Sequence, residues 1–180
     1  MTRALLMFLG MLAATAQAAS PPGPHDFDFL AGEWQVRHRY LRATDTGTQW
    51  ANAVGTCSHR LFTDSWANLE EHVIDAPGGS YRAVALRSYD VKSREWAIWW
   101  LDGRDPAGKI DPPMKGRFEK GVGTFYGELD VNGTRTSVRF IWSRITASSA
   151  QWEQAYSSDG GRTWETNWIM QFSRAPAAND

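Results

Sequence analysis

The sequence predicts an all-β domain folded as an antiparallel up-and-down β-barrel of about ten strands. Apolar and polar residues alternate in ten short segments, which is typical of strands with two unlike faces. Hairpin-sized turn signals such as 45–47 and 132–133 separate almost all of them, and no segment has a convincing helical period. Closure of so many strands leaves no sheet edge exposed. The expected strands are 33–42, 48–62, 66–74, 81–89, 95–101, 115–119, 123–131, 134–145, 150–157 and 162–173.

The first strand follows an apolar cluster and a glycine. Gly32 allows the backbone to turn sharply, and Trp34 at the first inward position can plug one end of a barrel. Alternation from Trp34 carries His38 and Tyr40 to the same inward face.

The second and third strands contain a cluster of polar residues that depends on their register. A two-residue turn at Asp64-Ser65 pairs His59 with Glu70 and Cys57 with His72 on one side of the sheet. Small residues elsewhere on that face suit a wall that contacts a ligand, and these groups suit metal binding or acid–base chemistry. A register change of one residue would dissolve the cluster, and a His–Glu pair on a solvated face is the alternative interpretation.

The middle of the chain contributes two further groups of candidates. Arg87 shares a face with Tyr81 and Tyr89, whereas Trp99 and Trp100 point to opposite sides, so that either could lie inside. The long segment 102–113 has prolines at 106, 112 and 113 that exclude a regular ladder, which predicts a lid or a crossing loop.

The C-terminal part contains a motif of the form S-x-D-x-G-x-T-W at 157–164. Because it occurs once, we expect a structural hairpin turn in which Asp159 accepts backbone hydrogen bonds, Gly161 supplies a positive φ and Trp164 packs beneath. The last strand has an apolar face predicted to point inward, formed by Trp164, Thr166, Trp168, Met170 and Phe172. Closure would bring Trp168 to the wall that holds His38.

Two motifs carry a resemblance to known proteins. F-x-F-L-x-G-x-W at 27–34 looks like the Gly-x-Trp signature of lipocalins and the wider calycin group. With D-G-G-x-T-W-E at 159–165, the chain resembles a bacterial lipocalin-like family of unknown function over about residues 25–174. The resemblance implies a ligand-enclosing barrel and supplies no catalytic residue.

The N-terminus predicts export. Arg3, the apolar run 4–14 and the small-x-small site at 16–18 form a signal peptide, followed by a Pro-rich leader at 19–26, the barrel domain at 27–174 and a tail at 175–180. The apolar run is too short for a membrane span, so we expect a periplasmic or secreted protein. Without residues 1–18, 18 basic residues face 20 acidic ones, which argues against nucleic acid or an anionic membrane surface as a partner. The single cysteine, Cys57, excludes an internal disulfide.

The ten tryptophans suit either core packing or a cavity for a flat apolar ligand. Our first hypothesis is a binding protein for a small hydrophobic or aromatic molecule, whose polar end, a carboxylate or a phenol, is oriented by buried polar side chains. Ordered water held by the same side chains is the competing interpretation. The expected cavity residues are His38, Tyr40, His72, Arg87, Trp100, Tyr156 and Trp168.

Two other hypotheses use the same barrel. One is an isomerase, hydratase or lyase in which His38 or His72 acts with a tyrosine as an acid–base pair. The other is a haem or metal binder, which the resemblance to small barrels with an axial histidine implies. No cofactor is assigned by the sequence, and no Cys-x-x-Cys or i,i+4 spacing indicates a metal.

Overall fold

The computed structural model describes residues 23–62, 64–108, 110–131 and 133–174. The predicted signal peptide, the leader up to residue 22 and the tail at 175–180 lie outside the described residues. Within the described ranges, no helix is long and apolar enough to cross a membrane.

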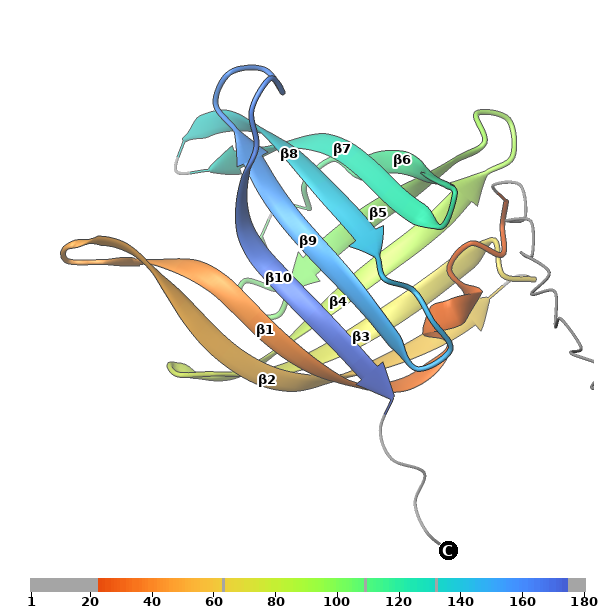
Figure 1. Cartoon of the computed structure of the whole chain (residues 1–180), viewed down its shortest axis with the longest axis horizontal. Coiled ribbons are helices and arrows are strands. Elements are labelled where there is room, and N and C mark those ends of the chain that lie inside the picture. The colour runs from red at the N-terminus through yellow and green to blue at the C-terminus, as the bar shows by residue number, and fades with distance from the viewer. Residues whose placement is uncertain (1–22, 63, 109, 132, 175–180) are drawn as a thin grey trace, which may run out of the picture.

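Ten antiparallel strands form a closed barrel in which each strand pairs with the next and β1 pairs with β10 (Figure 1). The predicted all-β up-and-down barrel is therefore confirmed. One short 3-10 helix, η1 (Asp28–Leu30), precedes the strands. The strands are β1 (Gly32–Thr44), β2 (Gly47–Phe62), β3 (Ala67–Ala76), β4 (Gly79–Asp90), β5 (Glu95–Asp102), β6 (Met114–Glu119), β7 (Val122–Val131), β8 (Thr134–Ser143), β9 (Ser149–Ser157) and β10 (Glu165–Arg174).

The η1 segment closes one end of the barrel. Phe27 is fully buried, and its ring centroid lies 4.9–6.0 Å from those of four aromatic residues, Trp96, Phe118, Phe125 and Trp142. Trp34 donates a 2.7 Å hydrogen bond from Nε1 to the Leu30 carbonyl, which fixes η1 over the core. Gly32 joins the two elements at φ +97°, a conformation that favours glycine.

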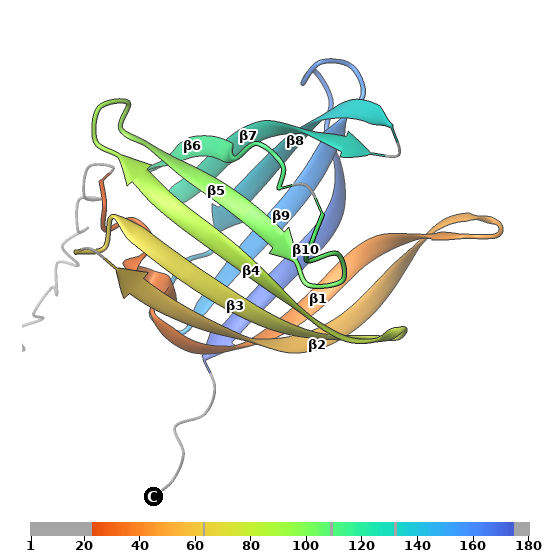
Figure 2. The ribbon, with the colours of Figure 1, turned by 180° about the vertical axis from the view of Figure 1, so that it is seen from behind.

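Arg174 at the end of β10 also holds η1 at this end of the barrel. Arg174 donates to the carbonyls of Ala31 (2.7 Å) and Phe29 (3.0 Å), and its guanidinium lies 3.8 Å from the Trp34 ring centroid. The opposite end of the barrel carries the β1–β2 hairpin, which projects well beyond the other strands, and the loop between β5 and β6 (Figure 2).

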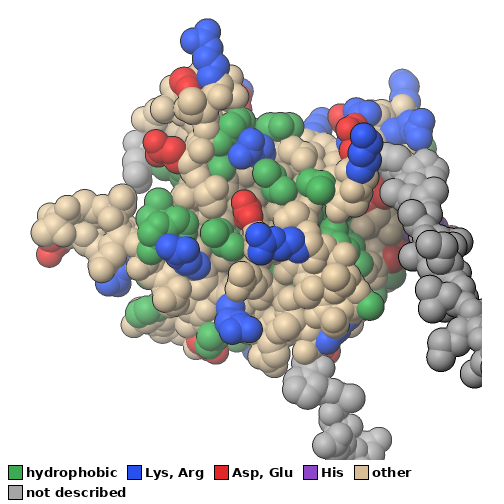
Figure 3. Space-filling model, viewed as in Figure 1, with side chains coloured by type: hydrophobic (Ala, Val, Ile, Leu, Met, Phe, Trp, Pro, Cys, Tyr) green, Lys and Arg blue, Asp and Glu red, His purple; other side chains and the backbone are tan. Residues whose placement is uncertain are grey.

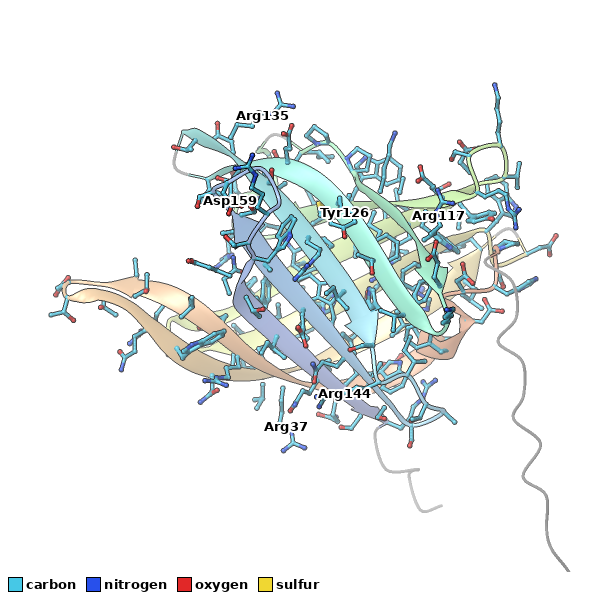
Figure 4. The ribbon with its side chains drawn as sticks, turned by 45° about the horizontal axis from the view of Figure 1, so that its top comes forward. Arg37, Arg117, Tyr126, Arg135, Arg144 and Asp159 are labelled. Carbon is cyan, nitrogen blue, oxygen red and sulfur yellow. The ribbon has the colours of Figure 1, made fainter. Side chains whose placement is uncertain are left out.

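The inward face predicted for the last strand is confirmed for Trp168, Met170 and Phe172 but is wrong for Trp164. A β-bulge between Thr166 and Trp168 shifts the register against β9, so that Trp168, Met170 and Phe172 pair with inward positions. Trp164 instead lies against Tyr126 and Arg139 on the outer surface, with ring centroids of Trp164 and Tyr126 5.9 Å apart. Figure 4 shows Tyr126 on the outside of β7. A bulge inserts one unpaired residue and thereby reverses the faces on its two sides.

The outer surface shown in Figure 3 intersperses basic, acidic and apolar side chains and has no continuous basic area. Most of its described ion pairs, such as Arg82–Glu71, are exposed.

Candidate functional site

Two adjoining cavities occupy the barrel interior toward the end opposite η1. The inner chamber has a volume of about 110 Å³, and the mouth, which opens beside the β1–β2 hairpin, has about 640 Å³. Gln154 and Trp168 line both cavities and form the boundary between them.

The inner chamber is largely apolar. Four tryptophans contribute to it, and Trp168 packs edge-to-face against both Trp100 (6.1 Å) and Trp152 (5.6 Å). Asp111 and Pro112 of the β5–β6 loop also line it. The full lining is Glu70, His72, Ala85, Arg87, Ile98, Trp100, Asp111, Pro112, Met114, Leu129, Phe140, Trp142, Trp152, Gln154, Trp168 and Met170.

The mouth is more polar and contains three tyrosines. Tyr81 lies under the guanidinium of Arg104, which is 4.1 Å from the ring centroid and also pairs with Asp102 at 2.6 Å. Burial raises the pKa of both Tyr81 and Tyr156, so that their hydroxyls stay protonated. The lining is His38, Tyr40, Leu41, Arg42, Ala43, Thr48, Ile74, Ala76, Tyr81, Arg104, Gln154, Tyr156, Glu165, Asn167 and Trp168.

One wall of the inner chamber is a buried polar network, which we call the Glu70 cluster: Cys57, Asn68, Glu70, His72 and Arg87. Glu70 Oε1 accepts from Cys57 Sγ (2.9 Å) and lies 3.3 Å from His72 Nε2, while Oε2 accepts from Arg87. Arg87 also donates to Asn68 Oδ1 at 3.2 Å. All five side chains are at most 3% exposed.

The register of β2 and β3 explains why this cluster forms. Cys57 pairs with His72 and His59 with Glu70, as the two-residue turn predicts. The alternative of a solvated His–Glu pair is wrong, because β4 and β5 continue the barrel past β3 and place this face inside.

The charges within the cluster compensate each other. Burial opposes ionisation of Glu70, but the charge of Arg87, followed by the contact with His72, holds its pKa well below the usual range. Burial, reinforced by the neighbouring Glu70 carboxylate, raises the pKa of the Cys57 thiol. The thiol therefore stays protonated and acts as a donor.

Two histidines outside the cluster are also held neutral. Burial lowers the pKa of His38 to about 4. Burial and then Arg87 lower the pKa of His59 to about 4. The Trp168 indole donates to His38 Nδ1 at 3.3 Å, which places the proton of His38 on Nε2.

Cys57, Glu70 and His72 place their possible ligand atoms within 4.8 Å of one another, which prompts comparison with a metal site. The fit is poor, because coordination needs a thiolate and a free carboxylate. Here the thiol is protonated, and Glu70 is already bound by the Arg87 guanidinium.

The seven predicted cavity residues divide between the two cavities. His72, Arg87 and Trp100 line the inner chamber, whereas His38, Tyr40 and Tyr156 line the mouth. Trp168 borders both, and His38 lies on its wall, with ring centroids 5.9 Å apart. Of the pair left open by alternation, Trp100 points inward.

Several cavity residues were not among these predictions. The sequence predicts Glu70, the centre of the network, as the partner of His59 but does not mark it as a cavity residue. Alternation along β9 does put Gln154 and Trp152 on the face of Tyr156, and the structure places all three in the two cavities. Trp142 lies on the neighbouring strand β8, where it pairs with Trp152. Asp111 and Arg104 lie in the β5–β6 loop, where alternation carries no information.

The motif at 157–164 forms the β9–β10 turn, at the same end of the barrel as Arg135 in Figure 4. Asp159 accepts hydrogen bonds from the backbone of Arg162 and Thr163, the Thr163 hydroxyl (2.7 Å) and the Ser157 hydroxyl (2.8 Å). These bonds, led by those of Thr163, lower the pKa of Asp159 to about 2. Gly161 has φ +87°, and Trp164 donates to its carbonyl at 3.1 Å.

Comparisons with known proteins support the fold. No family model and no curated protein matches the chain. Among solved structures, the S-type phycobiliprotein lyase CPES from Guillardia theta is similar, with a TM-score of 0.54 and 10% sequence identity over 83% of this chain and 90% of that chain. At this identity the similarity concerns the fold alone, a closed antiparallel β-barrel.

Proposed function

We propose that this protein binds a small molecule with a flat apolar body, which enters through the mouth and inserts into the inner chamber. The observation that carries the proposal is the inner chamber itself, an interior space walled by four tryptophans and continuous with a wider polar mouth. Binding sites for small molecules are typically concave and apolar, with a few polar groups that fix orientation. The phycobiliprotein lyase that shares this fold is consistent with a barrel that handles a small molecule.

The volumes of the two cavities suggest which part of the ligand occupies each of them. An engineered apolar cavity of about 150 Å³ holds one benzene ring, so the inner chamber, at about 110 Å³, suits a single ring or a short chain. The mouth is several times larger and lined by tyrosines, which suits a bulkier and more polar remainder.

The proposal is tested with N-phenyl-1-naphthylamine, a neutral flat probe whose fluorescence rises in apolar surroundings. We expect saturable binding with one probe per chain and energy transfer from tryptophan. Ala85→Phe should weaken it about tenfold or more, because Ala85 is buried in the chamber wall. Leu86→Phe is the matched control, since Leu86 follows on the same strand and is exposed.

Equal binding by the two variants, or no saturable binding by the wild type, would contradict the proposal. Native mass spectrometry of the protein as isolated would show directly whether a small molecule co-purifies.

A second candidate is an enzyme on the same barrel, favoured by the position of His38. This neutral imidazole lines the mouth together with Tyr40 and Tyr156, and a histidine with a tyrosine can act as an acid–base pair. An absorption spectrum of the purified protein separates both candidates from a haem binder, which would show a Soret band.

We also propose that the protein is exported and belongs to the lipocalin-like family that its two motifs resemble. The small-x-small site at 16–18 supports export, and N-terminal sequencing of periplasmic or secreted protein should begin near residue 19. Recovered protein that still begins at Met1 would contradict it.

A further inference from the structure

The inner chamber contains polar atoms that the protein leaves unpaired. Among the described residues, His72 Nδ1, Arg87 Nε and Trp142 Nε1 are buried without a hydrogen-bond partner. All three side chains line the inner chamber and are at most 3% exposed. Unpaired buried polar atoms are costly, so they mark a place where a ligand group can gain hydrogen bonds.

The network assigns a role to each of these atoms. The bond between His72 Nε2 and Glu70 places the His72 proton on Nε2, because a carboxylate only accepts. A neutral imidazole that donates from Nε2 carries a lone pair on Nδ1. His72 Nδ1 is therefore an acceptor, whereas Arg87 Nε and Trp142 Nε1 are donors.

Arg87 and Trp142 lie together at the chamber floor. The guanidinium carbon of Arg87 is 5.7 Å from the Trp142 ring centroid and 4.8 Å from that of Phe27, the plug residue. The chamber thus presents two donors at its floor and one acceptor on its β3 wall, which complements a group that both donates and accepts.

The charge balance decides which kind of group that is. Apart from the His72 imidazole, Arg87 is the only basic side chain lining the chamber among the described residues, and it is already engaged by Glu70 and Asn68. Asp111 adds a second carboxylate to the lining. A buried ligand anion would therefore lack a free counter-charge and meet two acidic neighbours.

We propose that the inner chamber recognises a neutral hydroxyl on a ring, a phenol or a cyclic alcohol, which donates its proton to His72 Nδ1. This inference rests on the proposed function and names the chemistry of the buried end of the ligand. The sequence suggests a carboxylate or a phenol as the polar end of the ligand, and the charge balance of the chamber favours the phenol.

The test compares three ligands of similar size, 4-propylphenol, propylbenzene and 4-propylbenzoate, by calorimetry at neutral pH with the wild-type protein. We expect 4-propylphenol to bind about tenfold or more tightly than propylbenzene and 4-propylbenzoate to bind most weakly. Equal affinities for the phenol and propylbenzene would overturn the hydroxyl site while leaving the proposed function intact. Tightest binding of the benzoate would overturn the preference for a neutral group. Failure of all three to bind, together with failure of the naphthylamine probe, would overturn the proposed function itself.

His72→Phe provides the variant test, because it keeps a ring but removes the acceptor. We expect the affinity ratio of 4-propylphenol to propylbenzene, both measured on this variant, to fall to about one; a ratio that stays near the wild-type value would contradict the site. The control is His59→Phe, since His59 is buried beside the cluster but does not line the chamber. Should His72→Phe fail to fold, histidine ¹⁵N resonances of the wild type decide the question. The Nδ1 signal of His72 should shift with 4-propylphenol and stay in place with propylbenzene, and equal shifts would contradict the site.

Discussion

Replacing Glu70 by leucine tests whether the buried network is a balanced unit. Glu70 is 1% exposed and accepts from Arg87 and Cys57, with His72 Nε2 in contact at 3.3 Å. The substitution leaves the Arg87 charge buried with only Asn68 as a described partner. Breaking a buried ion pair from one side costs about 3–5 kcal/mol, a large part of the ~5–15 kcal/mol that stabilises a typical domain.

The next residue on β3 supplies the control. Glu71 pairs with Arg82 on the outer surface, where the two side chains are 40% and 71% exposed. Exposed pairs contribute about 0–1 kcal/mol, so Glu71→Leu should change stability little. The double variant Glu70→Leu/Arg87→Met should recover most of the loss, because it removes the uncompensated charge as well.

The assay is urea unfolding followed by tryptophan fluorescence, with the free energy of unfolding taken from the midpoint and the slope. The reasoning is refuted if Glu70→Leu is no more destabilising than Glu71→Leu. It also fails if the double variant is as unstable as Glu70→Leu, because the cost would then come from lost packing and not from the Arg87 charge.

Three further outcomes follow from the structure. Trp34→Ala should destabilise by about 3–5 kcal/mol, because the ring is 1% exposed and bonded to Leu30; a wild-type urea midpoint would show that Trp34 does not hold the plug. Stability should fall as pH drops from about 6.5 to about 4, since unfolded His38 and His59 bind protons there while the folded residues stay neutral. Each histidine should lower the free energy of unfolding by up to about 3 kcal/mol over this pH range. Urea midpoints that do not change between pH 6.5 and pH 4 would contradict the assignment of His38 and His59 as neutral. Asp159→Ala should lower the melting temperature and leave probe binding unchanged, since its bonds lie within the β9–β10 turn; a folded variant that no longer binds the probe would show a role beyond the turn.

The sequence predicted the barrel well, because alternation and turn signals are local properties. The β2–β3 register, for example, followed from one two-residue turn and placed His59 opposite Glu70. Alternation fails at the bulge before Trp168, because an unpaired inserted residue leaves no mark on the apolar pattern, and it therefore predicts the wrong face for Trp164.

The site was harder to predict than the fold. Which inward residues meet depends on how the strands tilt around the closed barrel, and Arg87 reaches Trp142 across the interior from β4 to β8. The same closure buries Glu70, which a two-stranded view could equally have left in solvent.

The contacts of Arg174 have a consequence for the order of folding. This residue pairs with Trp34 and bonds to the carbonyls of Phe29 and Ala31, so it joins the two ends of nearly the whole described chain. During synthesis from the N-terminus, β1 can pair with β2 early but cannot gain its second neighbour until β10 emerges. Contacts so distant in sequence are closed late and slowly. Until its last strand is made, the growing chain therefore carries an open sheet edge and an η1 that lacks its Arg174 contacts. In this interval the chain is most exposed to wrong pairing or to a chaperone.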